Sequence, residues 1–295
     1  MKTAVGIVGL GLLGHAVASR LLAAGHRVVG HDVLPEKVRA LEALGGKAAP
    51  SAEATAQAAE IVCTLLPSLA AVEAAILGPR GVLAGARPGQ VLVQMSTISP
   101  ALTERLAREA VARGVEFLDC PVSGTSGMVA RGEGMLFVGG DPATLERCRP
   151  VLEAILPRVV QVGRPGQAMV VKLAANLLVG LHTVAAAEAL ELVRKAGLDP
   201  DQVLDVLTRS AGTSRMLELR GPLIVRQDYP PQMKLDLFLK DLRLILEAGA
   251  DAGAALPLTA LARRLYEAAA ADGLGGQDLA AVATALERWP VGADG

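Results

Sequence analysis

Residues 3–24 read TAVGIVGLGLLGHAVASRLLAA, and this stretch decides the fold. A short apolar run of β type, residues 3–8, leads into the glycine-rich segment GLGLLG at residues 9–14. A helical pattern follows over residues 15–24. This is a G-x-G-x-x-G spacing between a strand and a helix, which is the context in which that spacing predicts a dinucleotide site.

Each glycine of this segment has its own expected role. Gly9 permits the tight turn, Gly11 lets the backbone approach a pyrophosphate, and Gly14 lets helix and strand pack closely. The helix N-terminus then offers free N–H groups and the positive end of its dipole to the phosphates. We therefore expect the whole turn to bind the cofactor: Gly9, Leu10, Gly11, Leu12, Leu13 and Gly14.

A second expected strand, residues 27–32, ends in Asp32. An aspartate at this place can accept hydrogen bonds from both ribose hydroxyls of the adenosine, and it repels a 2′-phosphate. NAD is therefore the favoured cofactor, and NADP is possible but less favoured. Asp32 could alternatively be a solvated turn residue.

β-type runs and helical stretches continue to alternate up to residue 162, as a doubly wound parallel sheet requires. Beyond it only helical patterns remain. The sequence thus predicts an α/β protein with a Rossmann-type NAD-binding domain over residues 1–162 and an all-helical domain over residues 163–295. The expected strands of the first domain continue with residues 61–66, 91–95 and 116–118, and its expected helices with residues 36–44, 51–60, 72–77 and 100–113.

Polar or turn-forming pairs follow two of these strands. Leu66-Pro67 and Ser96-Thr97 stand at carboxyl ends, where ligands bind in such sheets. Each pair could also be an ordinary turn that ends a strand.

Residues 119–140 contain many small hydroxyl and glycine residues, beginning DCPVSGTSG. Such a segment leaves backbone N–H groups reachable and suits the capture of a carboxylate. The alternative is a flexible surface turn.

The stretch of residues 163–188 forms an almost wholly apolar helix that carries Lys172 and Asn176. Four residues apart, they share one helix face. An ammonium among Val, Leu and Ala is costly to bury unless something uses it, although Lys172 could instead reach the surface and Asn176 sit at a helix contact. Within it, residues 174–187 come nearest to a membrane span, but His182 and Thr183 interrupt this run, so we expect a buried core helix and no membrane association.

The second half predicts further helices that begin at Asp199-Pro200 and span residues 234–252, 257–271 and 277–288, before a frayed tail at 289–295. Helices this apolar in a small domain favour a homodimer or homotetramer. Within residues 234–252, Lys240 could form a surface ion pair with Asp236.

Composition excludes several classes of protein. The 295 residues suffice for two domains, and 52% of them are hydrophobic against 20% charged. A formal net charge of −1 gives no basis for expecting a nucleic-acid partner. The three cysteines lack metal-ligand spacing, so no metal site is expected, and they are consistent with a reducing cytoplasm.

An ordered series of motifs over nearly the whole length resembles the β-hydroxyacid dehydrogenases of the 3-hydroxyisobutyrate dehydrogenase and tartronate semialdehyde reductase group, relatives of 6-phosphogluconate dehydrogenase. The series comprises residues 9–14, His31-Asp32-Val33, Leu65-Leu66-Pro67, Ser96-Thr97-Ile98-Ser99-Pro100, residues 119–124, residues 163–176 and Lys240-Asp241-Leu242.

The resemblance implies roles for individual residues. Lys172 would be the catalytic lysine with Asn176 beside it, and Ser123 and Gly124 would hold the acid group of the substrate. Lys240 would contact cofactor or substrate. The remaining expected cofactor contacts are Leu65, Leu66, Pro67, Ser96 and Thr97.

Three positions depart from the family pattern. Cys120 replaces the usual alanine, Thr125 replaces a second glycine in the substrate loop, and Ala175 replaces an asparagine on the lysine helix. Thr125 adds a side chain where substrate should approach, so it is an expected substrate contact that could alter which acid fits.

The resulting hypothesis is a reversible NAD-dependent oxidation of the CH–OH group of a small β-hydroxy acid such as 3-hydroxyisobutyrate, or reduction of the matching semialdehyde. An imine reductase of the same architecture is one alternative, although such enzymes generally place a different proton donor where Lys172 stands. A catalytically inactive NAD(P)-binding module is the other.

Overall fold

The computed structural model describes residues 2–290 and divides the chain into two compact units, Met1–Lys172 and Leu173–Gly295. The division falls inside the long helix α9 (Gln167–Lys195). The assignment of a cofactor domain to residues 1–162 and a helical domain to residues 163–295 stays a prediction.

The first unit is built on one nine-stranded sheet with the order β3-β2-β1-β4-β5-β6-β8-β7, and β9 also pairs with β8. All pairings among β1 to β6 are parallel. The order 3-2-1-4-5-6 is that of a doubly wound dinucleotide-binding sheet, so the predicted Rossmann-type fold is confirmed. The strands are β1 (Ala4–Val8), β2 (Arg27–His31), β3 (Lys47–Ala48), β4 (Ile61–Thr64), β5 (Val91–Gln94), β6 (Glu116–Asp119), β7 (Val122–Ser123), β8 (Met135–Gly140) and β9 (Val159–Gly163).

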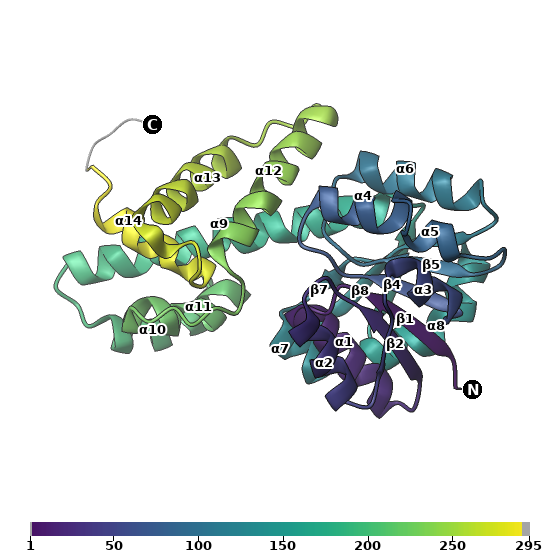
Figure 1. Ribbon diagram of the computed structural model, residues 1–295. Helices are drawn as coiled ribbons and strands as arrows, with labels where there is room; N and C mark the ends of the chain where they lie inside the picture. Colours follow the sequence, from purple (N-terminus) through teal and green to yellow (C-terminus); the bar gives the residue numbers. More distant parts are fainter. Residues whose placement is uncertain (1, 291–295) are drawn as a thin grey trace. The chain divides into compact units, whose positions relative to one another are not determined.

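Helices cover both faces of this sheet (Figure 1). Successive strand residues alternate between two cores: Cys63 and Val93 face one, while Val62 and Leu92 face the other. Strands buried on both faces explain why these segments read as continuous apolar runs. The helices are α1 (Leu12–Ala23), α2 (Pro35–Ala43), α7 (Ser126–Ala130) and α8 (Pro142–Ile155) on one face, and α3 (Ala52–Gln57), α4 (Leu69–Leu77), α5 (Val82–Gly85) and α6 (Pro100–Val111) on the other.

The segment of residues 119–140 is more ordered than a flexible turn. It contains β7, α7 and β8, with Val122 opposite Leu136 and Ser123 opposite Met135 in an antiparallel ladder. The strand β8 does not stand out in the sequence because its apolar residues are bounded by glycines. The hairpin fixes Ser123 to the sheet.

The second unit consists of helices, as predicted, with a single β-bridge between Lys234 and Asp278 among the described residues. Its helices besides α9 are α10 (Pro200–Arg209), α11 (Arg215–Arg226), α12 (Leu235–Asp251), α13 (Pro257–Ala269), the π-helical turn Ala270–Leu274, the 3-10 helix Leu279–Val282 and α14 (Ala283–Glu287).

The expected helix over residues 277–288 is wrong in its first part, where the chain forms a 3-10 turn. The cause is Asp278, which is fully buried and caps that turn through the Ala280 N–H. Its carboxylate also accepts hydrogen bonds from Arg220 and from the Gln232 and Met233 amides. A buried carboxylate needs such partners. Here the hydrogen bonds connect the segment that precedes α12 with the 3-10 turn. Of the expected tail, residues 291–295 lie outside the described part of the chain.

Helix α9 alone among the described helices has the length and composition to cross a membrane, and it qualifies by those criteria only. A long apolar core helix meets the same criteria. The buried positions of α9 include Met169, Leu173 and Leu190.

Candidate active site

The three glycines of the turn between β1 and α1 differ in the space around them. Gly9 and Gly14 leave no room for a side chain, whereas Gly11 is open. A Cβ on Gly9, where φ is +96°, would overlap the Leu65 carbonyl oxygen, and a Cβ on Gly14 would overlap the Gly9 carbonyl oxygen. A Cβ on Gly11 would meet no atom within 4 Å. The open side of Gly11 is where the fingerprint expects a pyrophosphate.

The N-terminus of α1 fits a phosphate for a second reason. Its cap, Gly11, offers no side-chain hydrogen bond, and its first turn has no acidic residue. Ser51, Ser68, Ser99, Asp141 and Ser214 cap other helices with their side chains. An uncapped helix start with a positive dipole end is suited to an external anion.

Asp32 lies just beyond β2 and already accepts two backbone hydrogen bonds. Its Oδ2 accepts from the Leu10 N–H at 2.7 Å, and Oδ1 accepts from the Leu34 N–H at 2.9 Å. The Leu10 side chain is 2% exposed and packs in the core, while its backbone N–H holds Asp32. The neighbouring Leu12 is exposed at the start of α1.

The ends of β4 and β5 are joined through Ser96. The Ser96 hydroxyl accepts from the Leu66 N–H at 2.8 Å and donates to the Thr64 carbonyl at 3.3 Å. Ser96 is buried, whereas Thr97 beside it is partly exposed. Ser96 therefore orders the Leu65-Leu66-Pro67 turn, which borders Gly9, and Thr97 is the better placed of the pair to meet a ligand.

The predicted substrate loop begins at the end of β7. Ser123 is partly exposed, and Gly124 has φ +154°, which only glycine adopts readily. The Thr125 hydroxyl accepts from the Met128 N–H at 3.3 Å and caps α7. The side chain that departs from the family pattern thus has a structural task in addition to the substrate contact expected of it.

Lys172 is the last residue of the first unit and is only 9% exposed. It lies on α9 one turn after Ala168 and Met169, both fully buried. Within residues 2–290 no group of three or more His, Cys, Asp or Glu side chains could hold a metal ion.

In the second unit, Asn176 forms a short chain of polar contacts with α12. Its Nδ2 donates to Asp241 Oδ2 at 2.7 Å, and Lys240 Nζ lies 2.8 Å from Asp241 Oδ1 as an ion pair. Asn176 and Asp241 are 6% and 2% exposed. The contact fixes the orientation of the Asn176 amide. The ion pair that Lys240 forms is thus with its neighbour Asp241, whereas the alternative considered from sequence was Asp236.

Asp119, at the end of β6, is a fully buried carboxylate. Its Oδ2 accepts from the Gly166 N–H at 2.9 Å and from the Met169 N–H at 3.0 Å. Burial raises the pKa of Asp119 to about 7, although the two backbone hydrogen bonds act to lower it.

The pH dependence of stability tests this burial. The folded protein retains the Asp119 proton up to about pH 7, whereas an unfolded aspartate loses it near pH 3.9. Between these values the ionised form is penalised only in the folded state, so stability falls as pH rises, by about 1.4 kcal/mol per pH unit. We expect Asp119→Asn to remove this fall. In urea unfolding, the free energy of unfolding of the variant should therefore rise relative to that of the wild type as the pH increases from 4 to about 7. Parallel curves for the two proteins would contradict the assignment.

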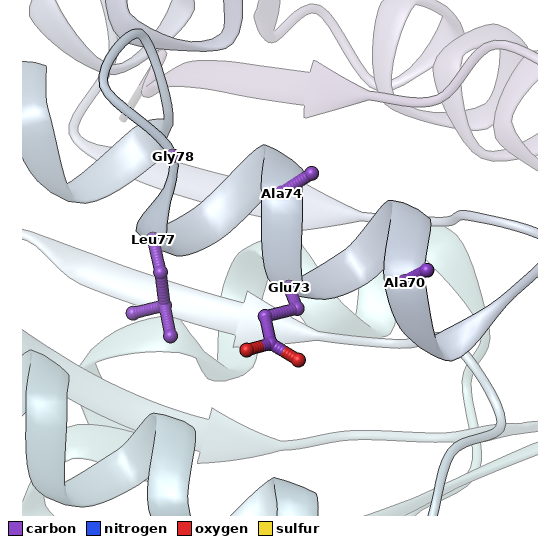
Figure 2. Close-up of a pocket in the computed structure, with 5 residues that line it drawn as sticks. All are labelled: Ala70, Glu73, Ala74, Leu77 and Gly78. Atoms are coloured by element: carbon purple, nitrogen blue, oxygen red, sulfur yellow. The ribbon is translucent and has the colours of Figure 1, made fainter.

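A surface hollow of about 420 Å³ beside α4 is separate from these residues. Figure 2 shows Glu73 and Leu77 projecting to the same side of that helix. Glu73 forms an ion pair with Arg105 at 2.6 Å. None of the predicted site residues lines this hollow.

Comparison with known proteins defines the class first. Residues 4–163 match the family described as the NAD binding domain of 6-phosphogluconate dehydrogenase, and residues 166–286 match that described as the NAD-binding of NADP-dependent 3-hydroxyisobutyrate dehydrogenase. These matches make the protein an NAD(P)-binding oxidoreductase. Relatives and solved structures narrow this class, and the chain belongs to the β-hydroxyacid dehydrogenase family.

The relatives match over almost their whole lengths. A 2-(hydroxymethyl)glutarate dehydrogenase from Eubacterium barkeri is 36% identical over 96% of this chain and 95% of its own. A 2-hydroxy-3-oxopropionate reductase from Escherichia coli is 34% identical over 96% of this chain and 97% of its own. A crystal structure of 3-hydroxyisobutyrate dehydrogenase from Salmonella typhimurium is 35% identical and covers 96% of this chain and 99% of its own, with a TM-score of 0.87.

Two other solved structures have the same fold. A 28% identical neighbour with a TM-score of 0.87 was solved in complex with NADP+. An imine reductase from Streptomyces aurantiacus is 21% identical with a TM-score of 0.66, a likeness that shows the shared fold alone.

Asp119 and Asp241 stand in two of the family motifs, but no role was predicted for either from sequence. Asp119 was visible as an acid that ends an otherwise apolar strand, and Asp241 as an acid on a leucine-rich helix. Each is a charge in an apolar setting, the same signal that singled out Lys172.

Proposed function

We propose that this protein oxidises the CH–OH group of a small β-hydroxy acid with NAD, or reduces the matching semialdehyde, with Lys172 as general base and acid. The observation that carries the proposal is a nearly buried lysine on α9, followed one turn later by Asn176. Family membership supports it, because relatives are dehydrogenases and reductases of hydroxy and oxo acids.

In this proposal Lys172 takes the hydroxyl proton during oxidation and returns it during reduction. Asn176, held by Asp241, hydrogen-bonds the substrate or fixes the lysine. Ser123 and Gly124 bind the carboxylate, with Thr125 beside them and Lys240 as a further contact to cofactor or substrate. The fixed hairpin at Ser123 keeps the reacting carbon in place.

The bound nicotinamide supplies the hydride acceptor. The residues that would hold it are those at the carboxyl ends of β1, β2, β4 and β5. They comprise the turn of residues 9–14, Asp32, Leu65, Leu66, Pro67, Ser96 and Thr97. Lys240, on α12, is proposed as a further contact.

Asp32 is proposed to favour NAD over NADP, and this gives a second prediction. We expect Asp32→Asn to raise KM for NAD about tenfold or more, because a charged hydrogen-bond acceptor for the ribose hydroxyls is lost. Discrimination against NADP should shrink at the same time, because a charge that repels the 2′-phosphate is gone.

Steady-state kinetics with both cofactors measure this effect, and Glu36→Gln is the matched control. Glu36 is an exposed acid in the first turn of α2, so its loss changes net charge equally. Equal effects of the two variants, or an unchanged cofactor ratio in Asp32→Asn, would refute the role of Asp32.

The direct test of the proposed reaction is isotopic. 3-Hydroxyisobutyrate carrying deuterium on its hydroxyl-bearing carbon should yield reduced cofactor that contains deuterium. Cofactor reduction without label transfer would rule out oxidation at that carbon. We also propose that the protein is a homodimer or homotetramer in the cytoplasm. Light scattering of the purified protein would measure the mass of the assembly.

A further inference from the structure

The buried carboxylate of Asp119 lies between two parts of the proposed site, the loop that leads to Ser123 and the start of α9. The chain leaves β6 at Asp119 and reaches Ser123 four residues later, after Cys120 and Pro121. From the other direction, the Gly166 and Met169 amides that bond to Asp119 lead into α9, and Lys172 follows Met169 by three residues.

The two amides belong to the start of a helix, where N–H groups lack partners within the helix. Asp119 accepts from both through one oxygen, so it caps α9 from a strand that is 47 residues away in sequence from Gly166. When Asp119 is ionised, above about pH 7, its negative charge also interacts favourably with the helix dipole. The start of α9 is thereby fixed to the end of β6.

Glycines let this junction pack closely. A Cβ on Gly139, the register partner of Asp119 on β8, would lie 2.5 Å from the Arg164 carbonyl oxygen. Gly166 has φ +92°. The backbone that enters α9 therefore packs closely against the sheet at Gly139, and the Asp119 side chain joins the two through its hydrogen bonds to Gly166 and Met169.

Burial of the Asp119 carboxylate has a cost in desolvation free energy. Asp119 has no exposed surface, its Oδ1 has no hydrogen-bond partner among the described residues, and burial raises the pKa of the group. A neutral acceptor would make the same two bonds at a lower desolvation cost.

We infer that Asp119 is a positioning residue that sets the place of Lys172 relative to the Ser123 loop. It touches neither substrate nor cofactor and acts through the backbone of α9. The inference rests on the proposed function, because it concerns the geometry of the proposed lysine base.

The test compares three full-length variants with the wild type. Asp119→Ala removes both bonds, whereas Asp119→Asn keeps an oxygen that can accept from both amides. Asp141→Ala is the matched control, because Asp141 caps α8 in the same unit through the Thr144 N–H, on a helix without the lysine. The readouts are amide hydrogen exchange over residues 164–172 without cofactor, the Kd for the cofactor, and kcat with a β-hydroxy acid.

We expect Asp119→Ala to speed exchange at the start of α9 and to lower kcat by about 10- to 100-fold, since small misplacements of a catalytic group have effects of this size. The Kd for the cofactor should stay within about twofold, because the binding turns are elsewhere in the sheet. Asp119→Asn should restore slow exchange and most of kcat, and Asp141→Ala should leave both unchanged.

The inference is overturned if Asp119→Ala loses exchange protection yet keeps kcat, or if Asp119→Asn keeps protection yet loses as much kcat as Asp119→Ala. If Asp119→Ala does not fold, Asp119→Glu replaces it: the carboxylate is displaced by one methylene, and an unchanged kcat would overturn the inference. A wild type without turnover on any β-hydroxy acid refutes the proposed function instead, and the exchange data then still report whether Asp119 fixes α9.

Discussion

Replacing Lys172 with alanine is expected to lower kcat by about 10²- to 10⁴-fold, the range that a general acid–base group contributes. The reason is that no other basic side chain of the first unit lies on α9 beside it, and the lysine is nearly buried rather than solvated. Cofactor binding should persist, because the turns after β1, β2, β4 and β5 do not depend on this side chain. The measurement is single-turnover and steady-state kinetics alongside a binding titration with reduced cofactor.

Lys195→Ala is the matched control for this variant. Lys195 lies on the same helix in its last turn and is exposed, with Glu191 at 3.6 Å. Its removal should leave kcat within about twofold of the wild type. Near-normal turnover of Lys172→Ala, or equal losses in both variants, would contradict the role of Lys172.

The second large effect is expected from Gly14→Ala. The added methyl overlaps the Gly9 carbonyl oxygen, which is backbone and cannot rotate away. We expect the free energy of unfolding to fall by about 3 kcal/mol, at the upper end of overpacking effects, and cofactor binding to be lost with the turn. Urea unfolding and a fluorescence titration with NADH measure the two consequences.

Gly11→Ala, in the same turn, distinguishes an effect on cofactor binding from an effect on stability. Its methyl would stand in open space, so stability should change by less than about 1 kcal/mol, the size of a lost glycine cap. The Kd for the cofactor should nevertheless rise, because the methyl occupies the approach of the pyrophosphate. Normal binding by Gly11→Ala would show that the phosphates do not lie against this turn.

The parallel part of the sheet could be predicted because its strands are short apolar runs between helical patterns, and the fingerprint supplies its first turn. The helix at Asp199-Pro200 was equally clear, since a capping aspartate and a first-turn proline mark its start. The second strand was expected to end in Asp32, whereas β2 is Arg27–His31 and Asp32 is the next residue.

The antiparallel strand β8 and the 3-10 turn at Leu279–Val282 could not be predicted, because each depends on partners far away in sequence. β8 exists through pairing with β6, β7 and β9, and the 3-10 turn through a buried carboxylate that accepts from Arg220. The same holds for the roles of Asp119 and Asp241, whose hydrogen-bond donors are 47 or more residues away in sequence. Local patterns identify the residues that are unusual, whereas tertiary contacts decide what they do.

The most direct test of the central claim is the initial rate of cofactor reduction with a panel of small β-hydroxy acids, measured beside the rate of cofactor oxidation with cyclic imines. The panel comprises 3-hydroxyisobutyrate, 2-(hydroxymethyl)glutarate and L-threonate, each with NAD and with NADP. We expect turnover of at least one hydroxy acid, faster with NAD, and no reduction of the imines. Imine reduction without hydroxy-acid oxidation would contradict the central claim.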